Sequence, residues 1–117
     1  MNGGAFYNCS NLSGEIKIEE GTSLEKFAFE GTGITKVTIG NGVDLIDNSF
    51  SNCSKLKNVV IGDDVTIRHS TFINCGTIES VIMGKNIKMN GSDKDANATF
   101  YNSNVKKATV YYDNILK

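Results

Sequence analysis

The sequence lacks most of the features on which common functional sites depend. It has one histidine, His69, and its three cysteines form no Cys-x-x-Cys pair, so neither a zinc site nor a catalytic triad is indicated. The 12 basic and 13 acidic side chains give a net charge of −1, and the longest basic run is Lys106-Lys107. Such a distribution provides no electrostatic footprint for nucleic acid. We expect no enzymatic activity, no cofactor and no nucleic-acid partner.

Long apolar runs are also missing. No stretch approaches the roughly 18 apolar residues that a membrane-spanning helix needs, and no apolar segment follows Met1 to form a signal peptide. If the protein is exported, its signal lies outside this sequence. Neither end carries the polar cap that normally closes a repeat array. We therefore expect residues 1–117 to be one domain, and a fragment of a longer repeat array, or to associate end to end with another copy.

A four-residue phrase that begins with phenylalanine dominates what is present. It occurs five times, as Phe6-Tyr7-Asn8-Cys9, Phe29-Glu30-Gly31-Thr32, Phe50-Ser51-Asn52-Cys53, Phe72-Ile73-Asn74-Cys75 and Phe100-Tyr101-Asn102-Ser103. The phenylalanines are 23, 21, 22 and 28 residues apart. A period in this range predicts a solenoid in which each repeat forms one coil. The five rings should then stack as a column in the core.

Other positions of the repeat are filled as consistently as the phenylalanine. The residue two after Phe is Asn or Gly, and these two share a tolerance of positive φ, so this position predicts a left-handed turn that ends a short helix or 3₁₀ segment. Alternating β-branched runs predict a first strand in each coil, at residues 16–18, 37–39, 59–61, 81–83 and 108–110. Shorter alternations predict a second strand at 43–45, 65–67 and 87–89. The fold class is thus a mostly β repeat solenoid with short helical or 3₁₀ corners.

The three cysteines share one position, three residues after Phe. Thr32 and Ser103 occupy the same position, so it requires a small, weakly polar side chain more than it requires sulfur. Buried free thiols are the favoured interpretation. A disulfide between Cys53 and Cys75 on adjacent coils remains open, because Cα atoms about 5 Å apart can be bridged.

The pattern Leu-x-x-Val-x-Ile-Gly-x-x-Val-x-Ile-x-x-x-x-Phe-x-Asn-Cys resembles the BspA-type leucine-rich repeat, most closely over residues 50–83. The resemblance implies a right-handed superhelix of about five 22-residue coils. It also implies a surface or secreted protein that adheres to host proteins or to other cells. The sequence departs from the family pattern in having Gly in place of the proline that usually follows the strand, and about six extra residues within 90–98.

If the first strand of each coil lines the inner curve of the solenoid, the residues between its buried positions face outward in two rows. The first row is Lys17, Thr38, Val60, Ile82 and Thr109, and the flanking row is Glu15, Lys36, Asn58, Ser80 and Lys107. Val60 and Ile82 are apolar where their neighbours are polar, which is typical of a protein-contact site. The alternative is that β-branched residues simply favour strands. The sequence predicts a protein-binding face centred on this pair.

Three further interpretations remain beside this one. The repeats could serve only as a spacer that presents other domains. An enzyme of the β-helix type acting on polysaccharide would need clustered carboxylates, which only Asp44, Asp47, Asp63 and Asp64 approach; aspartate is expected at turns in any case. A weak calcium candidate comprises Asp93, Asp95 and Asn97, although Ala98 stands where such a loop needs Gly.

Overall fold

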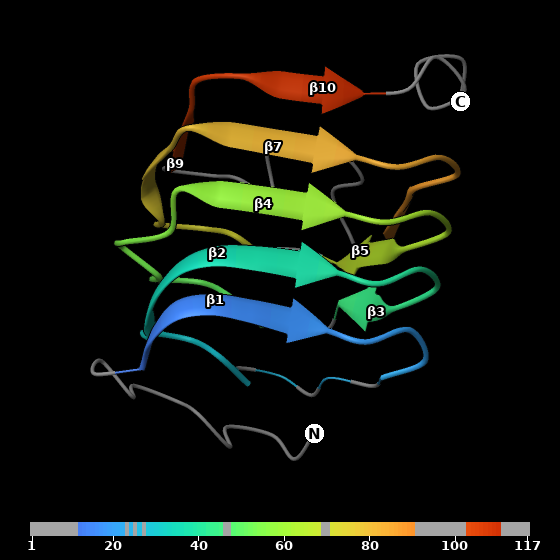
Figure 1. The fold of residues 1–117 in the computed structure, drawn as a ribbon, viewed down its shortest axis with the longest axis horizontal. Coiled ribbons are helices and arrows are strands. Elements are labelled where there is room, and N and C mark those ends of the chain that lie inside the picture. Colours follow the sequence, from blue (N-terminus) through green and yellow to red (C-terminus); the bar gives the residue numbers. More distant parts are fainter. Residues whose placement is uncertain are drawn as a thin grey trace.

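The chain winds into stacked coils whose strands lie on three sides (Figure 1). The computed structural model describes residues 12–22, 24, 26, 28–45, 48–68, 71–90 and 103–110. Every strand pair in these residues is parallel. Parallel neighbours require the chain to return to the same side after each coil. The predicted repeat solenoid is therefore confirmed.

The largest sheet contains the first strand of each coil. In spatial order its strands are β1 (Ser13–Ile18), β2 (Gly33–Ile39), β4 (Asn58–Ile61), β7 (Ser80–Met83) and β10 (Ala108–Val110). Alternate side chains point into the core, where Val37, Val59 and Val81 form one buried row. All five predicted first strands are confirmed, and the residues between the buried positions make up the outer face of this sheet.

Two smaller sheets complete the coils. The predicted second strands form a three-stranded sheet of β3 (Asp44–Leu45), β5 (Thr66–Arg68) and β8 (Lys88–Asn90). The third sheet pairs β6 (Gly76–Ile78) with β9 (Ser103–Val105) and was not predicted. Its two strands each end at an aliphatic residue, Ile78 or Val105, and Ile78 is fully buried.

The corner that carries phenylalanine is a turn, so the expectation of helical or 3₁₀ corners is wrong for the described residues. Several backbone amides there donate to the next coil. The Phe29 amide donates to the Ser49 carbonyl at 2.8 Å, and the Gly31 amide donates to the Ser51 carbonyl at 3.0 Å. A helix would need these donors within its own coil. The predicted left-handed position is confirmed, with φ of 75° at Gly31 and 60° at both Asn52 and Asn74.

The phenylalanines stack as predicted. The ring centroids of Phe29 and Phe50 are 5.3 Å apart, and those of Phe50 and Phe72 are 5.5 Å apart, with interplanar angles of 1° and 9°. All three rings are buried. Ala28, Ser49 and Thr71, which precede the rings, are buried as well. The other two predicted members, Phe6 and Phe100, lie outside the described residues.

The cysteine position supplies a hydrogen-bond donor to the coil before it. The Cys53 thiol donates to the Phe29 carbonyl at 3.2 Å, and the Cys75 thiol donates to the Phe50 carbonyl at 3.1 Å. In the next coil the Ser103 hydroxyl donates to the Phe72 carbonyl at 2.7 Å. Because a thiol and a hydroxyl can both donate this hydrogen bond, either cysteine or serine can occupy the position.

Cys53 and Cys75 are free, buried thiols, so the structure contains no disulfide between them. Burial raises the pKa of both thiols, because a thiolate would lose its hydration in the core. For Cys75 the pKa rises to about 12. Thiols with so little thiolate at neutral pH are inert, which fits a structural role.

Glycines after the first strands let successive coils approach closely. A Cβ atom on Gly40 would lie 2.6 Å from the Glu20 backbone nitrogen and 2.9 Å from the Ile18 carbonyl oxygen. The same position in the next two coils is occupied by Gly62 and Gly84, where a Cβ would again meet the preceding coil. The Gly40 amide uses this proximity to donate to the Ile18 carbonyl at 2.7 Å.

Candidate protein-binding face

The outer face of the five-stranded sheet carries the predicted rows in register. Lys17 pairs with Thr38, Thr38 with Val60, Val60 with Ile82 and Ile82 with Thr109. In the flanking row the pairs are Glu15–Lys36, Lys36–Asn58 and Asn58–Ser80. Lys107 precedes β10, and its carbonyl accepts the Val81 amide at 2.9 Å. The structure thus brings together the residues that the sequence proposed for one surface.

The apolar pair lies near the middle of this surface. Val60 is half-buried. Ile82 is 41% exposed, and among the described residues it is the one large hydrophobic side chain that is exposed. Their backbones are directly paired on adjacent strands β4 and β7. Two neighbouring aliphatic side chains therefore form a small apolar patch, with Thr38 and Thr109 continuing the same row on either side.

Polar side chains beside the patch are ordered by contacts along the flanking row. The Ser80 hydroxyl donates to Asn58 Oδ1 at 3.0 Å. Lys36 Nζ lies 3.8 Å from Glu15 Oε2, and both side chains are partly exposed. An exposed ion pair of this kind stabilises a fold by less than about 1 kcal/mol. These groups keep hydrogen-bonding capacity for a ligand.

The aspartates considered for polysaccharide chemistry have structural partners instead of forming one cluster. Asp44 accepts two hydrogen bonds from Arg68, from Nε at 2.9 Å and from Nη2 at 2.8 Å. Asp63 accepts the Lys85 backbone amide at 2.9 Å and so links two coils. Asp64 has φ of 58° in the same turn, whereas Asp47 lies outside the described residues.

No group of three potential metal-ligating side chains occurs in the part of the chain that the structure describes. The calcium candidate of Asp93, Asp95 and Asn97 lies outside that part, and so does His69. The segment therefore stays a weak calcium candidate. A search of the same described residues finds no helix with the length and hydropathy to cross a bilayer.

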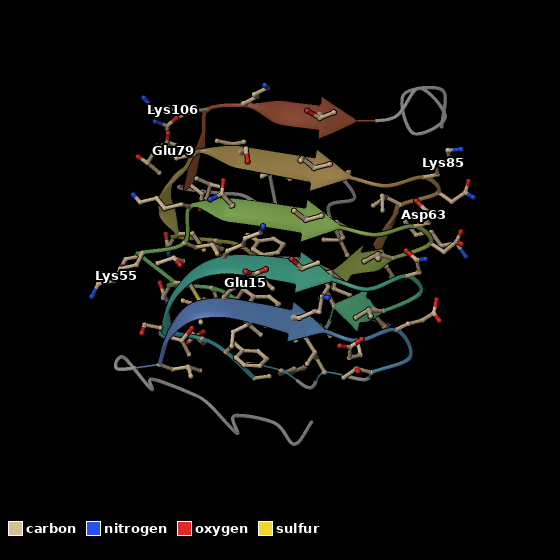
Figure 2. All side chains as sticks on the ribbon, viewed as in Figure 1. Glu15, Lys55, Asp63, Glu79, Lys85 and Lys106 are labelled. Atoms are coloured by element: carbon tan, nitrogen blue, oxygen red, sulfur yellow. The ribbon has the colours of Figure 1, made fainter. Side chains whose placement is uncertain are left out.

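A segregation of charge across the sheet escaped the sequence analysis. Lysines outnumber carboxylates before its strands, and carboxylates outnumber lysines after them. In Figure 2, Lys55 and Lys106 lie at the edge where the strands begin, and Asp63 lies at the opposite edge. In linear sequence these charges are scattered and nearly balanced. Aligning the coils and asking which charges precede or follow each first strand would have revealed the pattern.

Stacked parallel coils with strands on three sides define a β-solenoid repeat protein. A comparison with family models matches residues 1–106 to the BspA type Leucine rich repeat region, in six copies. The chain belongs to this family, as the repeated residues indicated. Neither a curated protein nor a solved structure matches the chain.

Proposed function

We propose that this chain is a non-enzymatic binding module of a cell-surface or secreted protein, and that it contacts another protein through the outer face. The observation that carries the proposal is the pairing of Val60 with Ile82 on adjacent strands, with Ile82 exposed. Membership of the BspA-type family supports it, because such repeats are often used for protein binding and are typical of surface or secreted proteins.

The composition of the face matches what a protein interface requires. Interfaces combine an apolar centre with a polar rim that holds hydrogen-bonding groups. Here Val60 and Ile82 are the centre, and Asn58, Ser80 and the two threonines of the row supply the rim. These centre and rim side chains have few rotatable bonds and lie on strands, so little conformational entropy is lost when a partner docks. Lys17, Lys36 and Lys107 add charge at the margins.

Selection of ligands from a random peptide-display library tests the proposal. The double variant Val60→Asp/Ile82→Asp places two carboxylates in the proposed contact. It should no longer bind the peptides selected on the wild-type chain. Because Ile82 is exposed and Val60 half-buried, the melting curve should change little. Loss of folding would show instead that the pair belongs to the core.

A matched control is available on another side of the molecule. Thr77 and Asn104 are directly paired on adjacent strands β6 and β9, so Thr77→Asp/Asn104→Asp adds the same charge to a different sheet. This variant should still bind the selected peptides. If both double variants bind them equally, the outer face is not the binding site, and a spacer role would account better for the repeats.

A further inference from the structure

The two edges of the outer face carry opposite charge. The edge where the strands begin, here called the basic edge, has four exposed lysines and one glutamate: Lys55, Lys57, Lys106, Lys107 and Glu79. The edge where the strands end, the acidic edge, has four carboxylates and one lysine: Glu19, Glu20, Asp63, Asp64 and Lys85. Formal charges are therefore +3 and −3, although the whole chain has a net charge of −1.

Figure 2 shows labelled members of the two sets at opposite ends of the strands. Lys55, Lys106 and Glu79 lie on the side where the strands begin, and Asp63 and Lys85 lie on the side where they end. None of the four lysines of the basic edge makes an ion pair with a described residue. Their charge is available to a partner.

The coil that contains β4 shows how far apart the two charged edges lie. Lys57 precedes β4, Val60 lies within it, and Asp63 follows it. At about 3.3 Å per residue, the two charged positions are roughly 20 Å apart along the strand. This exceeds the Debye length of about 10 Å at 0.1 M salt. Each edge therefore acts on the part of a partner directly above it.

The size of the face favours a segment over a large rigid surface. Five strands spaced about 4.8 Å apart span roughly 19 Å, and with a length of roughly 20 Å they offer about 400 Å². A stable interface between folded proteins usually buries about 800 Å² on each side. A second copy docked on this face alone would fall well short of that area.

We propose that the partner presents an extended segment that crosses the outer face along the strands, with acidic residues over the basic edge, apolar residues over Val60 and Ile82, and basic residues over the acidic edge. The inference rests on the proposed function and specifies the chemistry of its partner. A segment with a single sign of charge along its length would gain at one edge and be repelled at the other.

Two synthetic peptides of identical composition test this directly. Both have about nine residues, with isoleucines and serines in the middle. Each contains two glutamates and two lysines, and two of these four charged residues stand at each end. The inner charged residues are then about six positions apart, which matches the span of roughly 20 Å. In the segregated peptide the glutamates are at one end and the lysines at the other, and in the mixed peptide each end has one of each. Net charge and apolar content are thus equal.

Fluorescence anisotropy at low salt should show the segregated peptide binding about fivefold more tightly or better, because four weak surface pairs act together. The preference should shrink at 0.5 M salt. Lys55→Glu/Lys57→Glu changes the basic edge to a net −1 and should remove the preference. Adding Glu19→Lys/Glu20→Lys changes the acidic edge to +1, and the preference should partly return, because the peptide can bind in the opposite direction.

Each alternative outcome has a distinct meaning. If both peptides bind equally and Val60→Asp/Ile82→Asp abolishes both, the outer face binds protein but the bipolar partner is wrong. If neither peptide binds the wild-type chain, the bipolar segment is also wrong, while the display selection described above still decides the proposed function. If the preference survives Lys55→Glu/Lys57→Glu, it does not arise from the basic edge, and the inference fails.

Discussion

Removal of the central phenylalanine ring should destabilise the fold more than any exposed apolar change. Phe50 is fully buried and stacks on both Phe29 and Phe72, at 5.3 and 5.5 Å. Truncation of a buried phenylalanine to alanine costs about 3–5 kcal/mol. Because Phe50→Ala ends two ring contacts at once, each contributing about 0.5–1.5 kcal/mol, we expect a loss of unfolding free energy in the upper part of that range.

Urea unfolding followed by circular dichroism measures this loss. With an m-value of about 1–3 kcal/mol per molar urea, a loss of about 4 kcal/mol lowers the midpoint by roughly 2 M. The control Ile82→Ala removes an aliphatic side chain that is 41% exposed and should cost less than about 1 kcal/mol. Phe50→Leu keeps most of the apolar volume but loses the stacking, and should fall between them. Equal losses for Phe50→Ala and Ile82→Ala would refute the ring column.

Three further predictions concern the contacts between coils. Gly40→Ala should cost about 1–3 kcal/mol of unfolding free energy, because the new Cβ would meet backbone atoms of the preceding coil; an unchanged melting temperature would contradict this. Burial raises the pKa of Cys75 from 9.0 to about 12, so above pH 9 the unfolded chain loses the thiol proton that the folded chain keeps, and stability falls as pH rises. Between pH 8 and 10 the unfolding free energy of Cys75→Ser, measured by denaturation, should therefore fall by about 1 kcal/mol less than that of the wild type. If the unfolding free energies of the two proteins changed equally with pH, a buried thiol would be contradicted. Asp44→Asn should change stability by less than about 1 kcal/mol, because its pair with Arg68 is partly exposed, and a larger loss would mean that this pair holds the coils together.

The sequence predicted what depends on the period of the repeat. Phe29, Phe50 and Phe72 recur at intervals of 21 and 22 residues, so their stacking follows directly from one coil per period. Side-by-side placement of Val60 and Ile82 follows from the same interval. The positive φ of Asn52 and Asn74 was predictable because Gly fills the same position in another coil.

Features that depend on contacts between coils were missed. The strands of the β6–β9 sheet each contain one apolar residue, Ile78 or Val105, so no alternating pattern appears in the sequence. The corner amides were expected to bond within a helix, but they donate to the next coil, as the Phe29 amide does to Ser49. The donor role of Cys53 toward Phe29 likewise requires two coils to be seen together.

The opposite charges of the two edges were missed for a related reason. Lys57 and Asp63 are only six residues apart in sequence and look like a balanced, scattered pair. The strand between them carries them to opposite ends of the sheet. The basic and the acidic edge become visible only when the charges before and after the strands are added over several coils.

Methyl-resolved NMR tests most directly whether residues one coil apart lie side by side. Stacked coils predict cross-peaks that link Val37 to Val59 and Val59 to Val81 inside the core, as the strand register requires. On the outer face they predict cross-peaks that link Thr38 to Val60 and Val60 to Ile82. Absence of these cross-peaks, together with contacts between residues three or four apart along the same segments, would contradict the stacked coils and with them the proposed binding face.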